Sequence, residues 1–209
     1  MASPTSSLAA TSVSAAAAAA PFHLVPLAGA PDVVHGVRKL NLGALPVQCP
    51  AVCYTRAEQD ADALQLSWAA VTPQGKVIGG VLAELEGNVV VIRTLAVDSG
   101  WRQRSVGRRL IEQVQHQTRQ LMAAIASDND EGSKQGHDDD NSTARAPNMR
   151  LPSRTLTPGA SVSLQLHVHV GNTDAQAFYE RIGFAQTARL TNYYRRLEPR
   201  DCFVYSLEL

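Results

Sequence analysis

The sequence predicts an α+β protein with a mostly antiparallel sheet of about seven strands. Residues 64–71, 77–86 and 89–97 are apolar stretches separated only by turn signals, which is typical of an antiparallel meander. The rest of the chain is expected to form a long helix, a strand, a short helix and two final strands. A chain of 209 residues has the length of one domain with additional tails or inserts.

The elements before the meander are a short strand and a helix. Residues 22–27 are predicted to form the strand. Ala30-Pro31-Asp32 opens the helix, in which Val33, Val37 and Leu40 share a face, and Pro46 is expected to end it. Turns at 72–75 and 86–88 then separate the three meander strands.

The elements after the meander also follow from local patterns. Apolar residues at helical spacing predict a helix over 105–125, and residues 162–170 are predicted to form a strand. Asn172 or Thr173 can cap the next helix, which Gly183 would end. Strands at 184–190 and 202–209 flank a loop that carries Asn192-Tyr193-Tyr194.

Two segments have a biased composition that predicts disorder. Residues 1–21 are rich in Ala, Ser and Thr, and no Lys or Arg precedes Arg38, which argues against a secretory signal or a mitochondrial presequence. A plastid transit peptide remains an alternative for this tail. Residues 126–160 are rich in Asp, Asn, Ser, Gly and Pro and are expected to be a disordered acidic insertion within a domain spanning 22–209.

Charge and cysteine content limit the partners and the compartment. The 19 Lys and Arg residues balance 19 Asp and Glu residues, so we expect no direct nucleic-acid or membrane partner. Apart from the weakly hydrophobic alanine tract, no run of about 18 apolar residues occurs, which predicts a soluble chain. The three cysteines lack paired zinc-site spacing, and we interpret them as reduced thiols of a cytoplasmic protein.

A basic turn entering the long helix is the first candidate site. Arg102-Gln103-Arg104-Ser105-Val106-Gly107 follows an apolar strand and is itself followed by Arg108 and Arg109. Unpaired N–H groups at a helix start can bind phosphate oxygens, and small residues allow the ligand to approach them. An ordinary basic helix start is the alternative interpretation.

This turn resembles the acetyl-CoA pyrophosphate loop of the GNAT N-acetyltransferases. Arg102 and Gly107 match the two ends of that motif, and Ser105 replaces its first glycine, which is costly if the position needs a positive φ. The resemblance implies that acetyl-CoA, the acetyl donor, is bound by Leu95, Ala96, Val97, Arg102, Gln103, Arg104, Ser105, Val106, Gly107, Arg108, Asn172 and Tyr179.

A second motif supports the same family. The family's Asn-x-x-A-x-x-F-Y-x-x-x-G-F pattern is matched by Asn172, Ala175, Phe178, Tyr179, Gly183 and Phe184. The resemblance implies the GNAT fold, an α/β sandwich in which a mixed, mostly antiparallel sheet carries helices on both faces. Within the family, residues 45–47, 166–168 and 192–199 are most similar to NatE catalytic subunits, which acetylate protein amino termini.

The candidate catalytic residues are His167 and Tyr179. His167 and His169 lie two apart on a predicted strand and so share a face, and a histidine has a pKa suited to accepting a proton near neutral pH. The resemblance assigns the general base to His167 and protonation of the leaving thiolate to Tyr179. Structural roles, or zinc binding by the His-x-His pair, are the alternatives, but no second pair accompanies it and we expect no metal.

The substrate-binding residues that the resemblance implies depart from the family in three places. Val91 replaces a tyrosine that assists the base, Cys49 replaces a substrate-facing tyrosine, and Arg93 replaces a methionine. Arg93 would favour substrates with a carboxylate in their first residues. The implied set is Leu45, Pro46, Val47, Cys49, Arg93, Tyr193 and Tyr194.

The expected function is N-alpha-acetylation of protein or peptide amino termini with acetyl-CoA. The resemblance adds the NatA complex and the ribosome as expected partners. One alternative is a GNAT enzyme that acts on lysine side chains or small amines. The other is a non-catalytic subunit that binds acetyl-CoA within a larger acetyltransferase, an alternative that Val91 keeps open.

Overall fold

The structure, a computed structural model, describes residues 21–59, 64–131 and 160–209. Its strands are β1 (His23–Pro26), β2 (Trp68–Val71), β3 (Val77–Glu86), β4 (Val89–Val97), β5 (Ser163–His169), β6 (Ala185–Leu190) and β7 (Cys202–Glu208). Its helices are α1 (Pro31–Ala44), α2 (Ala51–Gln59), the short 3₁₀ helix η1 (Ser99–Trp101), α3 (Val106–Glu131) and α4 (Thr173–Arg181).

The seven strands form one mixed sheet in the order β1-β2-β3-β4-β5-β7-β6. Strands β1 to β4 pair antiparallel as the predicted meander, and β7 pairs antiparallel with both β5 and β6. The β4–β5 pair is parallel and lies at the centre of the sheet. The predicted mixed, mostly antiparallel seven-stranded sheet is therefore confirmed.

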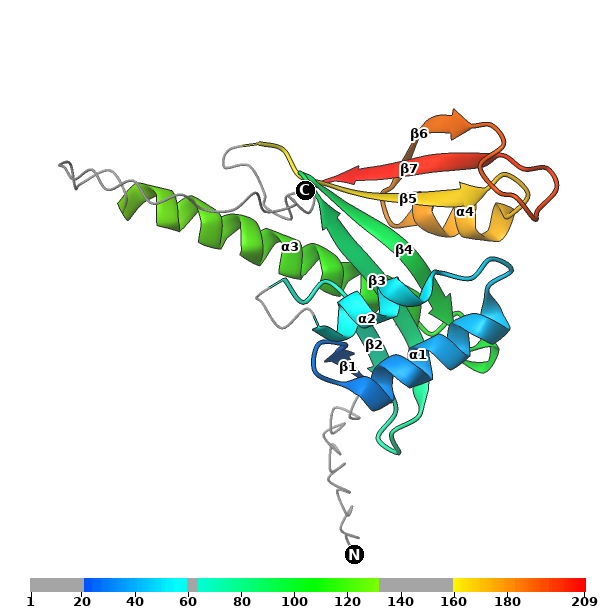
Figure 1. The fold of residues 1–209 in the computed structure, drawn as a ribbon, viewed down its shortest axis with the longest axis horizontal. Helices are drawn as coiled ribbons and strands as arrows, with labels where there is room; N and C mark the ends of the chain where they lie inside the picture. The colour runs from blue at the N-terminus through cyan, green and yellow to red at the C-terminus, as the bar shows by residue number, and fades with distance from the viewer. Residues whose placement is uncertain (1–20, 60–63, 132–159) are drawn as a thin grey trace, which may run out of the picture.

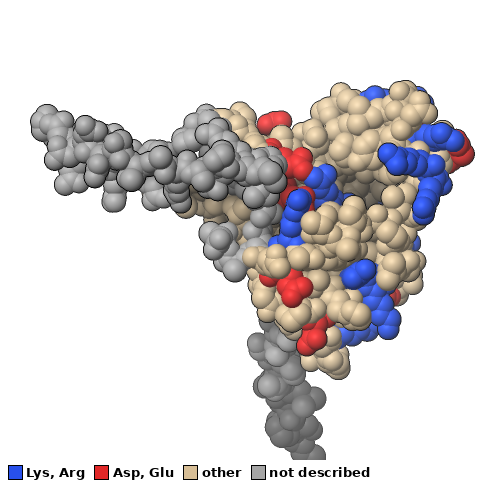
Figure 2. All heavy atoms as spheres, in the orientation of Figure 1, with Lys and Arg blue, Asp and Glu red and all other residues tan. Residues whose placement is uncertain are grey.

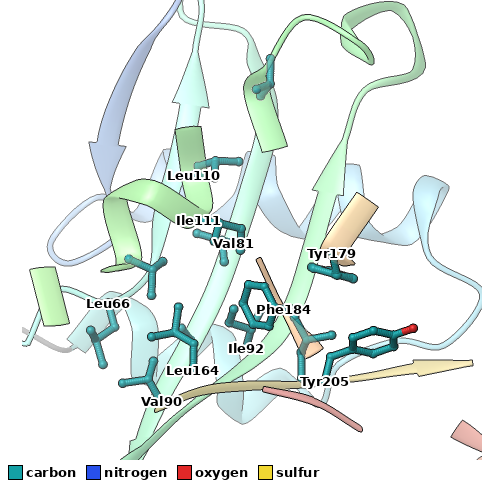
Figure 3. Close-up of a cluster of buried hydrophobic side chains, with 14 of the residues drawn as sticks. Leu66, Val81, Val90, Ile92, Leu110, Ile111, Leu164, Tyr179, Phe184 and Tyr205 are labelled. Atoms are coloured by element: carbon teal, nitrogen blue, oxygen red, sulfur yellow. The ribbon is translucent and has the colours of Figure 1, made fainter. Parts of the chain in front are cut away.

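Helices cover both faces of the sheet, as predicted (Figure 1). One face carries α1 and α2, whose buried residues, such as Val37 and Tyr54, form a cluster with Leu82 of β3. The other face carries α3 and α4, whose Leu110 and Tyr179 belong to a larger cluster. Figure 3 shows this second cluster, in which the long helix, the short helix and the strands β3, β4, β5 and β7 meet.

Two features of the N-terminal helices differ from prediction. The buried face of α1 consists of Val34, Val37 and Asn41 rather than Val33, Val37 and Leu40. Asn41 can be buried because its amide has hydrogen-bond partners: Nδ2 donates to Tyr54 Oη at 2.9 Å and to Thr94 Oγ1 at 3.2 Å. Buried polar groups generally need such partners. Helix α2 was not predicted, because its buried residues, Cys53, Tyr54 and Ala57, include small and polar types that give a weak apolar pattern.

The segment boundaries also need correction. Strand β2 begins only at Trp68, so the strand predicted over 64–71 is shorter than expected. Helix α3 continues past residue 125 to Glu131, and the acidic insertion predicted to begin at 126 starts with helical residues. The predicted disordered tail, apart from residue 21, and residues 132–159 of the insertion lie outside the described residues. Within the described ranges, no helix is both long enough and apolar enough to cross a membrane.

Strand β4 contains a bulge at Arg93. In the pairing with β3, Leu82 lies opposite Thr94 and Ala83 lies opposite Ile92, so Arg93 is an extra residue with no partner in β3. The extra residue exchanges the two faces of the strand. Val91 and Arg93 face the α1–α2 side, whereas Leu95 and Val97, further along, pack against the cluster on the α3–α4 side.

Candidate functional site

The central parallel strands separate at the level of the bulge. Pairing between β4 and β5 runs from Val89 and Ser163 to Ile92 and Leu166 and then stops, while β5 stays paired with β7 up to His169. Figure 1 shows β4 and β5 diverging towards their carboxyl ends. Because one strand turns away from the other, side chains from both faces of the sheet can reach the same opening.

A cleft of about 1070 Å³ occupies this opening. Figure 2 shows the surface hollowed there, between the part of the molecule with β5, β6 and β7 and the part with α1 and α2. It brings together most of the residues expected to form the site, from five separate segments of the chain. They are Leu45, Pro46, Val47, Cys49, Arg93, Leu95, His167, Asn172, Tyr179, Tyr193 and Tyr194. The other expected acetyl-CoA residues, Ala96, Val97 and the turn 102–108, are not in its lining and lie beyond it, towards the end of β4 and the start of α3.

His167 has a ring that contacts tyrosine and is otherwise free. It lies on the half-buried face of β5, and its imidazole stacks on Tyr193 with ring centroids 4.7 Å apart and planes 13° apart. No residue in the described parts of the chain hydrogen-bonds to either ring nitrogen. Partial burial, followed by the charge of Arg93, lowers the pKa of His167, while Glu86 opposes the shift. The imidazole is therefore neutral near pH 7 and has a lone pair available.

His169, on the same face, has both ring nitrogens occupied. Its Nδ1 accepts a hydrogen bond from the Gly171 N–H at 3.2 Å, so Nε2 carries the proton and donates to Pro199 O at 2.6 Å. The ring also contacts Tyr194 edge-on. His169 thus fastens the end of β5 to the loop before β7 and has no free lone pair to accept a substrate proton.

Tyr179 approaches from the opposite face of the sheet. It lies on α4, and its ring packs against Phe178, Phe184 and Tyr205 at centroid distances of 5.1, 5.6 and 6.3 Å. Figure 3 shows the ring beside Phe184 and Tyr205 in the core. Its hydroxyl has no hydrogen-bond partner in the described parts of the chain. Burial raises the pKa of Tyr179, so the hydroxyl keeps its proton at neutral pH.

Asn172 and Gly183 frame the helix that carries Tyr179. The side chain of Asn172 caps α4, with Oδ1 accepting from the Ala175 N–H at 3.2 Å. Asn172 also lines the cleft, and its side-chain NH₂ group has no partner among the described residues. Gly183 follows α4 with φ +98°, a conformation that favours glycine. The predicted cap and stop of α4 are both confirmed.

The turn before α3 has the tight geometry that a phosphate loop needs. Ser105 has φ +59° and Gln103 has φ +58°, so serine occupies a left-handed position that favours glycine. The helical hydrogen-bond pattern starts with Arg109 N–H to Ser105 O at 2.9 Å, which leaves the earlier N–H groups directed outward. A Cβ on Gly107 would lie 3.3 Å from Phe178 Cζ, so glycine allows α3 to start close against α4.

The arginines of this turn differ in their surroundings. Arg104 lies over the ring of Trp101 at 5.2 Å and Arg109 over the ring of Phe22 at 4.5 Å. Arg108 is paired with Glu112 at 2.8 Å. Arg102 has no ion pair within the described ranges, which makes it the arginine of the turn that is most available to an anion.

Arg93 already has two carboxylate partners. Its Nε donates to Glu84 Oε2 at 3.2 Å, and its Nη2 pairs with Glu86 Oε1. Although partial burial acts to lower it, the pKa of Arg93 is raised by Glu86 and Glu84. Arg93 does line the cleft, as expected, but it is not a free cation. The physical basis for expecting it to bind a substrate carboxylate is therefore removed.

The remaining walls of the cleft are apolar or neutral. Val91 is buried and lines the cleft, and its side chain cannot carry a proton. Cys49 lies beside Cys53, and burial, followed by the neighbouring thiol, raises the pKa of Cys49. Both thiols are free, as is that of Cys202. Burial raises the pKa of Tyr194 to about 12, so this hydroxyl is also protonated.

Sequence reasoning missed Glu84 and Glu86, which pair with Arg93, and Arg56, which lines the cleft beside Glu84. A signal for the first two existed: the turn at 86–88 sets a hairpin register in which Glu84 lies opposite Val91 and Glu86 opposite Val89. Arg56 lies on the unpredicted helix α2 and could not have been placed. In the described parts of the chain, no three His, Cys, Asp or Glu residues are grouped as metal ligands would be.

Comparison with known proteins assigns the family. Residues 64–186 match the model of the acetyltransferase (GNAT) domain, and the chain belongs to this family. A zebrafish (Danio rerio) protein named N-alpha-acetyltransferase 50 is 37% identical over 51 residues. This match spans 24% of the chain and only 30% of that relative's length.

Solved structures share the fold. Arabidopsis thaliana Naa50, solved in complex with the bisubstrate analogue CoA-Ac-MVNAL, is 23% identical with a TM-score of 0.61, covering 91% of this chain and 100% of its own. Arabidopsis thaliana NAA60, solved in complex with a bisubstrate analogue, is 20% identical with a TM-score of 0.58, covering 90% and 97%. Ard1 from Thermoplasma volcanium is 16% identical with a TM-score of 0.59, covering 91% and 99%. At identities of 16–23%, these similarities show a shared fold and nothing further.

Proposed function

We propose that this protein is an acetyl-CoA-dependent N-alpha-acetyltransferase that acetylates protein amino termini by direct transfer to the α-amine. The observation that carries the proposal is the imidazole of His167, which has no hydrogen-bond partner among the described residues and lies in a cleft that Tyr193 and Tyr179 also line. A single opening thus holds a neutral base and a protonated acid on opposite faces of the sheet.

The residues beside this cleft fit acetyl-CoA. Outward N–H groups at the start of α3, the left-handed Ser105 and Arg102, which has no ion pair within the described ranges, suit a pyrophosphate. The NH₂ group of Asn172, which has no partner among the described residues, could bind another polar group of the cofactor. When bound, acetyl-CoA supplies an activated acetyl group.

The chain's own residues would move two protons during the transfer. As the α-amine forms its bond to the acetyl carbon, its proton passes to a nitrogen of His167, directly or through a water. As the carbon–sulfur bond breaks, the Tyr179 hydroxyl donates its proton to the sulfur. A terminal α-amine has a reference pKa near 8, against about 10.4 for lysine, so a mild base such as His167 suits it better.

Val91 supports a second candidate, a non-catalytic subunit that binds acetyl-CoA in a larger acetyltransferase. This buried valine stands where the resembled family has a tyrosine that assists deprotonation, and His169 cannot substitute because both its nitrogens are engaged. The cleft then holds one histidine base without a second proton-transfer group on β4. A GNAT enzyme for lysine side chains or small amines is the remaining alternative.

One assay separates the three candidates. Purified protein is given radiolabelled acetyl-CoA with peptides bearing free amino termini, amino-blocked peptides containing lysine, and polyamines. Transfer to the free amino termini alone supports the proposal, and transfer mainly to lysine or polyamines contradicts it. Acetyl-CoA binding without any transfer would support the non-catalytic subunit.

We further propose a cytoplasmic location and association with a larger amino-terminal acetyltransferase at the ribosome. The free thiols of all three cysteines agree with a reducing compartment. Among the solved structures with this fold is a NatC complex bound to a Gag peptide and CoA, 17% identical with a TM-score of 0.57. Co-sedimentation with ribosomes, with and without NatA, would test the association.

A further inference from the structure

A buried carboxylate in the cleft lacks a hydrogen-bond donor. Glu84 of β3 lines the cleft, and its side chain is only 8% exposed. Its Oε2 accepts from Arg93, but its Oε1 has no hydrogen-bond partner in the described parts of the chain. A buried charged oxygen without a donor is unfavourable, so a ligand that supplies one would be stabilised there.

The carboxylates of Glu84 and Glu86 have only one guanidinium within hydrogen-bond distance, that of Arg93. Arg93 is shared between Glu84 and Glu86, which puts two carboxylates against one guanidinium. The nearest additional cation is Arg56, whose Nη1 lies 3.6 Å from Glu84 Oε1, too far for a hydrogen bond. Because the Arg56 side chain is 48% exposed, it can move into solvent when another cation arrives.

The position of Glu84 identifies which ligand would meet it. In the sheet, Glu84 lies opposite Val91 on β4, and Val91 lies opposite Gln165 on β5. His167 follows Gln165 by two residues and so faces the same side of the sheet. Tyr179 and the turn before α3 belong to the other side. Glu84 therefore lies on the side of the amine acceptor.

We propose that Glu84 Oε1 binds the cationic side chain of a lysine or arginine in the first two residues of the acceptor, so that the protein prefers basic amino termini. This inference rests on the proposed function and names its substrate class. The incoming cation replaces the longer contact to Arg56 and gives the buried oxygen its missing donor. An acceptor with an acidic side chain would instead be repelled, because the unpaired atom in this wall of the cleft, Glu84 Oε1, is itself a carboxylate oxygen.

The test uses matched peptides that differ at position one or two in carrying lysine, its uncharged isostere norleucine, or glutamate. Binding to the CoA-loaded protein and turnover are both measured. We expect lysine peptides to bind about tenfold more tightly than norleucine peptides, the range of a charge-assisted hydrogen bond. Equal binding of lysine and norleucine peptides, or tighter binding of glutamate peptides, would overturn the inference.

Binding and turnover keep this inference separate from the proposed function. A lysine preference in binding without any transfer would support the inference and contradict the enzyme. Transfer to all amino termini without a lysine preference would support the enzyme and contradict the inference.

Three variants move the lysine-to-norleucine binding ratio in different ways. Glu84→Gln keeps the shape and lowers the ratio towards one. Arg56→Ala removes the competing cation and raises it, which keeps the test available if the Glu84 variant does not fold. Glu86→Gln is the control on the same strand and face, 53% exposed, and should change the ratio less than Glu84→Gln does. An unchanged ratio in both Glu84→Gln and Arg56→Ala would refute the assignment.

Discussion

His167 stacks on Tyr193 with their rings nearly parallel and their centroids 4.7 Å apart. This contact covers one face of the imidazole, and neither ring nitrogen has a hydrogen-bond partner among the described residues. Partial burial is the first cause of the lowered pKa of His167. By covering one face of the ring, the tyrosine contributes to this burial and fixes the orientation of the imidazole. Tyr193 itself is among the exposed large side chains, so it can be exchanged without opening the core.

The pH dependence of activity should reflect this contact. A base acts when it is unprotonated, so the acid limb of kcat/KM follows the pKa of His167, below its usual value near 6.5. Tyr193→Ala should uncover the ring, raise that pKa and move the acid limb to higher pH. NMR titration of the His167 ring would check this, with His167→Gln identifying the signal. An unchanged midpoint in Tyr193→Ala would contradict the explanation.

Loss of the base should lower turnover strongly. His167→Ala is expected to decrease kcat by about 10²- to 10⁴-fold, the usual contribution of general base catalysis, with acetyl-CoA affinity retained. His169→Gln is the contrasting variant, since this neighbour only fastens the loop before β7. It should lower thermal stability more than it alters the acid limb of the pH profile. Equal losses of kcat in the two variants would count against separate roles.

Removal of the Tyr179 hydroxyl should affect the chemical step without unfolding the core. Tyr179→Phe keeps the ring contacts with Phe184 and Tyr205, and it is expected to lower kcat by about 10²- to 10⁴-fold, the usual contribution of a general acid. Tyr205→Phe is the matched control. It removes a hydroxyl that donates to Glu180 at 3.0 Å, away from the cleft lining. A normal kcat in Tyr179→Phe would exclude it as the proton donor.

The left-handed serine predicts opposite effects of two substitutions. Ser105→Gly relieves the cost of φ +59° and should stabilise the protein by up to about 1 kcal/mol, with acetyl-CoA affinity equal or higher. Ser105→Val places a β-branched residue there and should cost about 1–2 kcal/mol and weaken acetyl-CoA binding. Thermal unfolding and acetyl-CoA titration would measure both. Gln103→Gly, at φ +58°, provides a second measure of the backbone effect alone.

Two glycines of α1 should respond differently to alanine. A Cβ on Gly36 would lie 2.6 Å from Val77 Cγ2, and we expect Gly36→Ala to destabilise the protein by about 1 kcal/mol net. Gly43 has no atom within 4 Å of the same position, so Gly43→Ala should stabilise by about 0.5–1 kcal/mol through helix propensity. Chemical denaturation of both variants would test this, and equal shifts would refute the packing argument.

Features that depend on neighbouring residues in the chain were predictable. The Asn172 cap, the Gly183 stop, the meander and the alternation of β5 each follow from a few adjacent positions. Most of the cleft could be named from motif resemblance, because the same segments line it. Helix α2 was not predicted because its buried residues are weakly apolar. The buried face of α1 was predicted wrongly because it depends on the hydrogen bond between Asn41 and Tyr54, a residue of α2.

The charge state of the cleft could not be obtained from motifs alone. Arg93 viewed by itself is a free cation, and only the hairpin register supplies the two glutamates that compensate it. His169 is a similar case, since its engagement depends on Pro199, thirty residues along the chain. In both cases, the sequence leaves open the partners of a residue rather than its position.

The bulge at Arg93 gives β4 one more side chain than regular pairing with β3 would allow. Because Leu82 pairs with Thr94 and Ala83 pairs with Ile92, deleting Arg93 would close the bulge and leave Thr94, Leu95 and Val97 on the faces that they already occupy. The deletion would remove the guanidinium that pairs with Glu84 and Glu86. One residue of strand length therefore changes the charge of the cleft, while the rest of the sheet is expected to keep its register.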